Sequence, residues 1–350
     1  MYCNVYKFNK ACIAMRNNNS AVIILPVVVV VVASTIIATN FSSFSFGQNE
    51  TNTQLVGLNY IKEFDSNGKF ITSWGTKGSG PGQFLHAHGI GLDSAGNVYV
   101  SDAENYKIQK FDSNGKFITS WGTKGSGPGQ FIQPESIVVD SNGNIFVADF
   151  GNSRIQKFDS NGKFITSWGS KGSGIGQFKG PWGIAVDSAG NVYVSDQKNP
   201  VVQKFDNNGK FITSWGSKGS GEGQFVHLHD IAVDSDDNVY VTDGRENSRV
   251  SKFDSNGKFI TSWGSKGSGP GQFNEDHGID IDSSGNIYVV DTRNYRIQKF
   301  SPDGTFIRQW GSTGCGPDQF LIAHDLKIDS SDNVYISDSG NVHFKLEAKC

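Results

Sequence analysis

The chain has 350 residues, with 31 Lys or Arg, 34 Asp or Glu, and a formal net charge of −3. The charged residues before position 58 are Lys7, Lys10, Arg16 and Glu50, so the remainder carries 28 basic and 33 acidic residues, a net −5. Nucleic-acid-binding proteins need a basic surface to displace counterions, so we expect no nucleic-acid partner. The 43 glycines are about twice the usual share, which in a regular sequence indicates many tight turns.

Residues 1–20 form a basic N-terminal segment, and residues 21–39 form an apolar run in which twelve of nineteen are Val, Ile or Leu. The run is near the lower length limit for a membrane-spanning helix, and the basic residues before it predict that the N-terminus stays inside. We expect either a cleaved signal peptide, with cleavage near Gly47, or a retained transmembrane anchor. Both predict an extracellular or cell-surface protein, secreted or membrane-anchored, with a polar linker at 40–57.

A phrase close to KFDSNGKFITSWG recurs six times from residue 58 onward and ends each time in tryptophan. The gaps between successive tryptophans are 47, 47, 47, 48 and 47 residues. A period of this length, rich in short β-like runs, means that one supersecondary unit is repeated. The six are Trp74, Trp121, Trp168, Trp215, Trp263 and Trp310.

Each unit contains four short β-like runs separated by turn sequences. In the second unit these runs are 135–140, 144–149, 154–159 and 163–169. Asn-Gly and Asp-Ser-Asn-Gly between apolar runs are strong hairpin signals, because Gly and Asn tolerate positive φ. The four runs, a to d in chain order, therefore predict an antiparallel meander, and the Asp residues that end runs a and b are expected to bond the turn backbone.

Six twisted four-stranded sheets with apolar faces must cover one another, and radial packing around an axis achieves this while leaving only short edges. We predict an all-β, six-bladed β-propeller over residues 58–350, with Trp and the Phe of each GQF between blades. The chain enters with runs c and d and ends with runs a and b, so the last blade is completed by the N-terminus. For its strand c we favour Tyr60–Phe64 over 342–346.

The segments HGIGLD…NVYVSDAENYKIQKFD (88–112) and HGIDID…NIYVVDTRNYRIQKF (277–300) resemble NHL repeats, over about residues 58–346. The family's His after the loop Asn is replaced here by Tyr, Ser, Pro or Val. The resemblance implies a six-bladed propeller that serves mainly as a binding platform for proteins or RNA. A minority enzymatic branch, the peptidyl-hydroxyglycine amidating lyases, holds zinc with histidines in the central cavity.

Positions that break the repeat are the candidate functional residues. Five residues before the end of run a, where the chain enters the central channel, the units carry three different chemistries: imidazole, carboxylate and indole. We predict that this ring forms the ligand-binding mouth of the channel, with two neighbouring carboxylates. The predicted site is His88, Glu135, Trp182, His229, Asp230, His277, His324 and Asp325.

Several further side chains fall beside this ring. Two residues before each ring position stand His86, Gln133, Gly180, His227, Glu275 and Ile322, and Asp276 also lies next to the ring. Trp182 is outside the repeated tryptophans, and it either adds packing or serves as an exposed aromatic anchor. We expect no bond between Cys315 and Cys350, because the former lies on the mouth side and the latter should lie on the opposite face.

Two functional hypotheses follow. The first is a monomeric, non-catalytic module, exported or membrane-anchored, whose channel mouth binds a protein, peptide or glycan. The second is a metal-dependent lyase or hydrolase that holds zinc or another divalent ion with His88, His229, His277 and His324, because three imidazoles and an open position form a catalytic zinc arrangement. No nucleophile–base constellation is evident, so no catalytic residues are assigned.

Overall fold

The computed structural model describes residues 12–16, 20–24 and 59–340, and the chain divides into two units, Met1–Asn52 and Thr53–Cys350. In the first unit, β1 (Cys12–Arg16) pairs with β2 (Ser20–Ile24) in an antiparallel hairpin. Residues 21–24 of the apolar run belong to β2, and residues 25–39 lie outside the described part. In the described ranges, no helix has the length and apolar character needed to cross a membrane.

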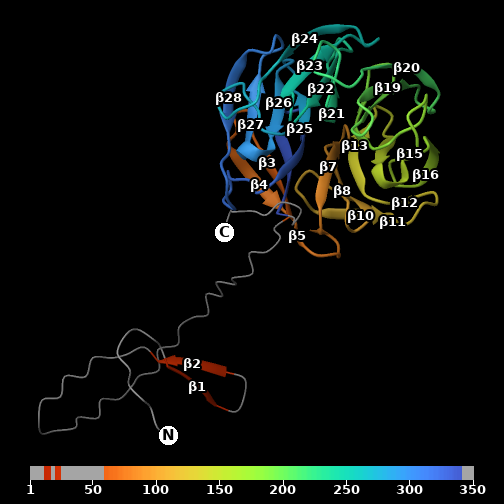
Figure 1. Ribbon diagram of the computed structural model, residues 1–350. Coiled ribbons are helices and arrows are strands. Elements are labelled where there is room, and N and C mark those ends of the chain that lie inside the picture. The colour runs from red at the N-terminus through yellow and green to blue at the C-terminus, as the bar shows by residue number, and fades with distance from the viewer. Residues whose placement is uncertain (1–11, 17–19, 25–58, 341–350) are drawn as a thin grey trace, which may run out of the picture. The chain divides into compact units, whose positions relative to one another are not determined.

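The second unit is a propeller of six four-stranded antiparallel sheets within residues 59–340 (Figure 1). This confirms the predicted fold. Blade 1 is β7 (Ala87–Leu92), β8 (Val98–Asp102), β9 (Lys107–Phe111) and β10 (Phe117–Trp121). Blade 2 is β13 (Pro134–Val139), β14 (Ile145–Asp149), β15 (Arg154–Phe158) and β16 (Phe164–Trp168). Blade 3 is β17 (Pro181–Val186), β18 (Val192–Asp196), β19 (Val201–Phe205) and β20 (Phe211–Trp215).

The remaining blades repeat this meander. Blade 4 is β21 (Leu228–Val233), β22 (Val239–Asp243), β23 (Arg249–Phe253) and β24 (Phe259–Trp263). Blade 5 is β25 (Asp276–Ile281), β26 (Ile287–Asp291), β27 (Arg296–Phe300) and β28 (Phe306–Trp310). Short elements precede or connect strands: β5 (Thr76–Lys77), β6 (Gln83–Phe84), β11 (Thr123–Lys124), β12 (Gln130–Phe131), and the 3₁₀ turns η1 (Phe150–Asn152) and η2 (Thr292–Asn294).

Blade 6 joins the two ends of the propeller. Its sheet order is β29 (Ala323–Ile328), β30 (Val334–Ser339), β3 (Asn59–Phe64) and β4 (Phe70–Trp74). β3 pairs with β30 from Tyr60↔Asp338 to Phe64↔Val334. The N-terminal run Tyr60–Phe64 therefore supplies strand c, as predicted, while 342–346 lies outside the described residues. Cys315 is disulfide-bonded, and Cys350 also lies outside the described residues.

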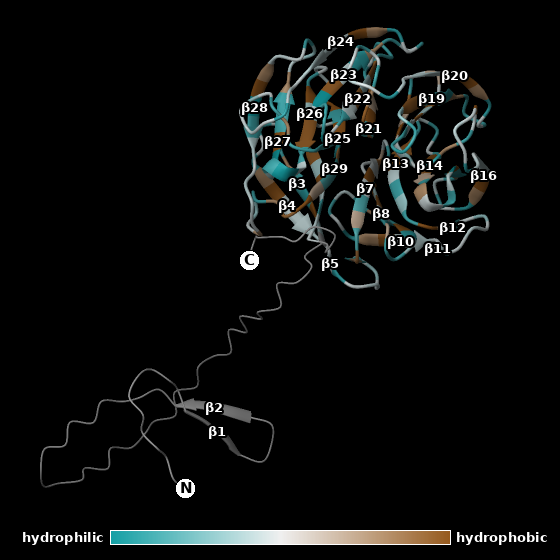
Figure 2. Cartoon of the chain, in the orientation of Figure 1, coloured by the Kyte–Doolittle hydropathy of each residue, from teal (hydrophilic) through white to brown (hydrophobic). Residues whose placement is uncertain are grey.

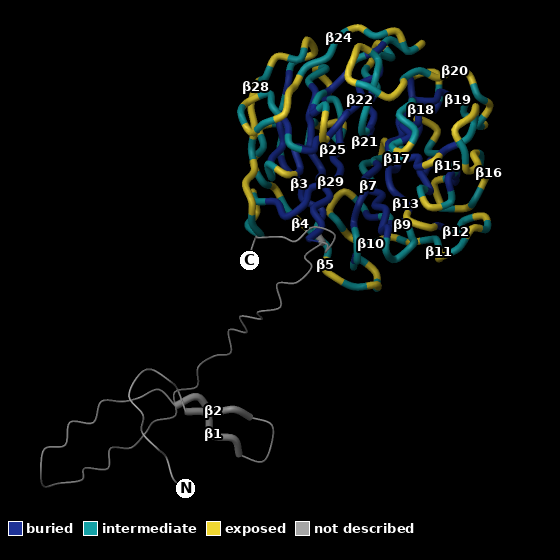
Figure 3. The backbone as a smooth tube through the Cα atoms, viewed as in Figure 1, coloured by how far each residue is buried: buried dark blue, intermediate teal, exposed yellow. Residues whose placement is uncertain are grey.

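The hydrophobic core lies between neighbouring blades. The GQF phenylalanines, such as Phe84, are fully buried, and Phe84 packs on Phe111 with ring centroids 5.7 Å apart. Trp74 at the end of β4 contacts Phe111 of blade 1 at 6.4 Å. The inner strands are the most buried in Figure 3, whereas brown, hydrophobic segments also mark outer strands such as β16 in Figure 2. These segments include the half-exposed Ile165.

The Asp residues that end runs a and b stabilise the turns of each blade. In blade 1, Asp93 Oδ1 accepts hydrogen bonds from the backbone N–H groups of Ala95 and Asn97. Asp102 Oδ1 accepts from the N–H groups of Leu85 and His86, which fixes the loop that leads into β7. These contacts confirm the predicted structural role of the repeated carboxylates, and they set where the channel mouth begins.

Candidate functional site

The first strands of the six blades line the channel, and each carries a β-bulge at its start. In blade 1 the register shifts between Ala87 and Ile90 opposite β8. A bulge re-aims side chains locally. Ser101 of β8 accepts a hydrogen bond from Gly89 N at 2.7 Å and also bonds the carbonyl oxygen of Glu135 in blade 2. This hydroxyl holds the bulge against the next blade.

Equivalent hydroxyls hold the other bulges. Ser195 bonds the carbonyl of His229 at 2.6 Å, and Thr242 bonds the carbonyl of His277 at 2.6 Å. Ser337 of blade 6 bonds the carbonyl of His88 in blade 1, so the same link closes the ring. The backbone of the histidine positions is thus fixed by buried Ser and Thr residues that sequence reasoning did not single out.

All six predicted ring residues line one cavity of about 160 Å³ at the channel mouth. From the positions two residues earlier, His86, Gln133, Glu275 and Ile322 also line it, whereas Gly180 and His227 do not. Gln197 and Arg245 complete the wall, and both come from loops between strands b and c that sequence reasoning missed. The ring residues are His88, Glu135, Trp182, His229, His277 and His324.

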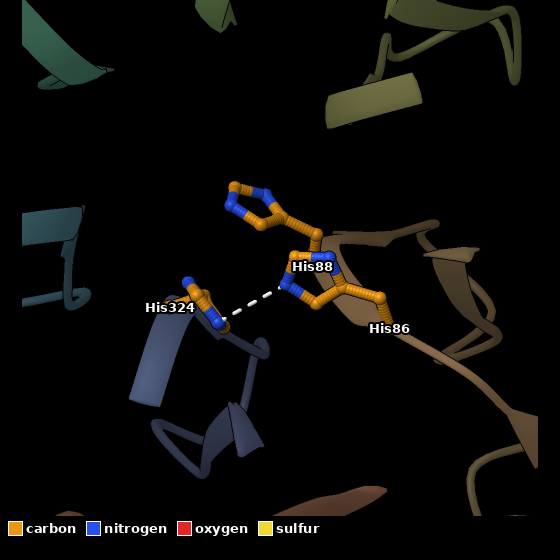
Figure 4. A group of neighbouring side chains, drawn as sticks. All are labelled: His86, His88 and His324. Carbon is orange, nitrogen blue, oxygen red and sulfur yellow. Dashed lines mark hydrogen bonds between the residues drawn. The ribbon is translucent and has the colours of Figure 1, made fainter. Parts of the chain in front are cut away.

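Three histidines of blades 1 and 6 converge on one point (Figure 4). One ring nitrogen from each of His86, His88 and His324 lies within 4.8 Å of the other two. Nε2 of His86 is 3.2 Å from Nε2 of His324, and the rings of His88 and His324 are 4.6 Å apart between centroids. Of the four histidines predicted to hold a metal, the structure brings His88 and His324 into this group and adds His86.

The other two predicted metal ligands, His229 and His277, stack on one another with ring centroids 4.0 Å apart. Nδ1 of His229 is 2.7 Å from the carbonyl oxygen of Asp276. A carbonyl only accepts, so Nδ1 carries the proton and the lone pair is on Nε2. Trp182 lies 5.1 Å from His88 and 5.7 Å from His229, so its indole joins the two histidine groups.

Burial and mutual repulsion keep most of these imidazoles neutral. Burial, followed by His88 and His86, lowers the pKa of His324 well below its ordinary value. Burial and His277 do the same to the pKa of His229. Burial also opposes the charged form of His88, but Glu135, whose Oε2 is 2.9 Å from Nδ1, outweighs it and raises the pKa of His88. The site therefore combines neutral imidazoles with one ion pair.

Glu275 forms a second charged centre in the cavity wall. Arg245 Nε is 3.0 Å from Oε1 of Glu275, and Arg293 Nε contacts Oε2. Burial favours the neutral carboxyl, yet the surrounding His277, Arg293 and Arg245 hold the pKa of Glu275 well below its usual value. The carboxylate is therefore ionised and binds both guanidinium groups.

The predicted carboxylates Asp230 and Asp325 do not belong to the cavity wall. Asp230 Oδ2 accepts a hydrogen bond from Ile279 N at 3.2 Å, and Asp325 Oδ2 accepts from Ile90 N at 2.9 Å. Lys327 lies between them, 3.6 Å and 3.9 Å away. Burial, opposed by Lys327, raises the pKa of Asp325 to about 7. These groups link adjacent blades in the layer behind the histidines.

Asp276 is also buried behind the ring. Neither carboxylate oxygen has a hydrogen-bond partner among the described residues, and burial raises its pKa well above the usual value. A neutral Asp276 carboxyl fits this apolar position, since an isolated buried charge would be far more costly.

Comparison with solved structures gives the same fold. A streptogramin B lyase has 16% identity and a TM-score of 0.56, covering 80% of this chain and 81% of its own. An inactive virginiamycin B lyase from Staphylococcus aureus, solved with quinupristin, has 12% identity and a TM-score of 0.55, covering 80% and 82%. A gluconolactonase from Xanthomonas campestris has 12% identity and a TM-score of 0.55, covering 74% and 88%. At these identities the likeness concerns the fold alone.

Sequence comparison gives the family. No curated protein matches the chain. The narrower resemblance to NHL repeats stays a prediction. A family model described as 6-bladed beta-propeller matches residues 59–113, 94–167, 184–248, 235–301 and 283–347, which is most of the chain. The chain therefore belongs to this 6-bladed beta-propeller family.

Proposed function

We propose that the propeller binds a divalent transition-metal ion at the channel mouth through His86, His88 and His324. The observation that supports this most is the convergence of three ring nitrogens within 4.8 Å. In a tetrahedral zinc site, nitrogen ligands lie about 3.3 Å apart. The 3.2 Å between His86 Nε2 and His324 Nε2 matches one such edge.

The chemistry of the donor set also fits. Zinc, nickel and copper bind neutral imidazole, and burial lowers the pKa of His324 so that its ring is neutral at physiological pH. Three protein ligands leave a further position open, as in catalytic zinc sites. An ion held there would polarise a carbonyl group or lower the pKa of a bound water.

The size of the cavity favours a small polar ligand over a protein, peptide or glycan. Its volume of about 160 Å³ is below the roughly 300–1,000 Å³ of ordinary ligand pockets. Such a space admits an ion and one small group of a larger molecule. We therefore assign the mouth to a small molecule and not to the macromolecular partner expected from the repeats.

Metal titration of the full-length chain tests the proposal. We expect one Zn²⁺ or Ni²⁺ per chain by calorimetry and by elemental analysis after gel filtration. His86→Gln and His324→Gln should each weaken binding by about 100-fold, because a ligand is removed. The matched control is His227→Gln, since His227 holds the same repeat position in blade 4 as His86 in blade 1. Loss of binding only in the control, or equal binding in all variants, would refute the site.

A lyase or hydrolase reaction is the second candidate, and the buried Glu135–His88 pair favours it. Glu135 is fully buried and its Oε2 is 2.9 Å from His88 Nδ1, so it is placed to orient a metal-binding imidazole. Lyases and a gluconolactonase share this fold. The test is chelator-sensitive opening of lactones or cyclic depsipeptides by the purified chain. Glu135→Gln should lower the rate, and an unchanged rate in EDTA would argue against metal-assisted chemistry.

We also propose export, supported by the apolar run at residues 21–39 and the basic residues before it. Cell fractionation together with mass spectrometry of the mature N-terminus distinguishes the two forms. A chain that begins near residue 48 indicates a cleaved signal peptide, and an intact chain in the membrane fraction indicates an anchor. An intact chain in the cytosol would contradict both.

A further inference from the structure

Basic side chains occupy one arc of the channel mouth. In blades 3, 4 and 5 the second residue after the Asp that ends strand b is Lys198, Arg245 and Arg293. All three are exposed, whereas the matching positions of blades 1 and 2 are Glu104 and Gly151. The positive arc therefore lies on the blades that do not supply the three-histidine group.

The one irregular spacing of the repeat contributes to this arc. The unit between Trp215 and Trp263 is 48 residues long where the others are 47, and its extra residue lies in the b–c loop 244–248. Arg245 in this loop has a φ of 56°, and Ser248 has a φ of 47°. Non-glycine residues in the left-handed region are uncommon. The inserted loop places the Arg245 side chain in the wall of the histidine cavity.

Glu275 holds the two guanidinium groups side by side. Its carboxylate is only 4% exposed, whereas the side chains of Arg245 and Arg293 are 50% and 49% exposed. Each arginine directs Nε to a different oxygen of Glu275. A buried carboxylate that receives two half-exposed arginines orients them toward solvent as a pair.

The arginine pair lines a second hollow that joins the histidine cavity. This hollow has a volume of about 380 Å³ and is bounded by Arg245, Lys266, Asn274, Glu275 and Arg293. Arg245 and Glu275 also line the histidine cavity, so the two spaces share a wall. Three cations and one carboxylate give the lining of the hollow a net charge of +2.

We infer that the ligand of the channel mouth carries an oxyanion, carboxylate or phosphate, which docks between Arg245 and Arg293 with Lys266 nearby. Planar guanidinium groups match the oxygen geometry of these anions and form strong charge-assisted hydrogen bonds with them. The rest of the ligand then extends toward His86, His88 and His324. That last placement, and only that, rests on the proposed metal site.

The test uses two probes, inorganic phosphate and succinate, titrated calorimetrically into metal-free full-length protein at low salt. We expect saturable binding of at least one probe that weakens with added NaCl. The stronger probe identifies the anion class. Arg245→Gln and Arg293→Gln should each weaken binding by about tenfold, the loss expected for one charge-assisted contact. Arg308→Gln, an exposed arginine on β28, is the matched control.

Two further variants keep the outcome decisive. Arg245→Lys retains the charge, so it should bind better than Arg245→Gln if Gln merely unfolds the loop. His324→Gln should bind phosphate or succinate as the unmodified protein does, so failure of the metal site leaves the oxyanion site standing. Absence of binding by both probes, or equal binding in Arg245→Gln, Arg293→Gln and Arg308→Gln, would overturn the inference.

Discussion

A Cβ atom on Gly162 would lie 2.5 Å from Cδ2 of Trp121, because the indole at the end of blade 1 packs directly on the c–d turn of blade 2. Gly162 also has a φ of 80°. We predict that Gly162→Ala lowers the free energy of unfolding by about 2–4 kcal/mol, from left-handed strain plus overpacking. Urea denaturation followed by circular dichroism measures it.

The control for this prediction is Gly176→Ala. Gly176 has a φ of 67°, but nothing lies within 4 Å of the position that a Cβ atom would take there. The alanine variant should therefore lose only about 1–2 kcal/mol, the cost of the left-handed backbone alone. Equal losses at both glycines would show that the Trp121 contact adds nothing.

Lys62 tests the closure of the ring. Its Nζ is 3.0 Å from Asp338 Oδ2, both side chains are buried, and it bonds the carbonyl of Gln319. Lys62→Met should lower the free energy of unfolding by about 3–5 kcal/mol, because it leaves the Asp338 charge buried without its partner.

Lys62→Gln should cost much less, because Gln is the residue that four other blades carry at this position. In blade 2, Gln156 Nε2 bonds both the carbonyl of Gln130 and Asp149 Oδ2. The same contacts are available from position 62. Thermal unfolding of both variants measures the difference, and a Gln variant as unstable as the Met variant would contradict this account.

The buried His229 gives a pH dependence with a definite sign. Burial and His277 lower its pKa in the folded state well below the 6.5 of an unfolded histidine. Below about pH 6.5 the unfolded chain therefore binds the extra proton, and the folded state loses about 1.4 kcal/mol per pH unit. Above that pH the contribution is constant.

The measurement is the free energy of unfolding in EDTA, compared between the unmodified protein and His229→Gln from pH 5 to 8. The comparison isolates this histidine from buried carboxyls such as Asp325, whose raised pKa acts in the opposite direction. We expect the two curves to converge as the pH falls. Parallel curves would mean that His229 is protonated in the folded protein.

Trp182 provides a spectroscopic reporter of the proposed metal site. Its ring centroid is 5.1 Å from that of His88, while the six repeated tryptophans, such as Trp215, pack against blade cores. Bound Ni²⁺ or Cu²⁺ should quench the fluorescence of Trp182 most. Trp182→Phe should remove most of the quenching and Trp215→Phe should retain it. The opposite pattern would place the ion elsewhere.

The period of the sequence predicts the blades, the turn carboxylates, the closing strand and all six ring residues, because each depends on local turn chemistry and strand alternation. The depth of Asp230 and Asp325 is not predictable in this way. They adjoin ring residues in sequence, but a bulge at the start of strand a decides which side chains enter the cavity and which face the next blade.

Arg245 and Gln197 were missed for a different reason. They lie on b–c loops, whose conformation depends on loop length and not on the strand pattern. The only sequence signal was the single 48-residue unit, which marks an altered loop in blade 4 without showing where its side chains point. The grouping of His86 with His88 and His324 likewise depends on side-chain directions that the repeat does not specify.

The pairing of β3 with β30 also has a consequence for biosynthesis. A ribosome makes β3 and β4 before any other part of the propeller, yet their partner strand is among the last to emerge. The first hairpin must therefore wait, with an open edge, until translation is almost complete. A premature stop that removes β29 and β30 would leave it permanently without a sheet, so the earliest residues of the wheel depend on the latest ones.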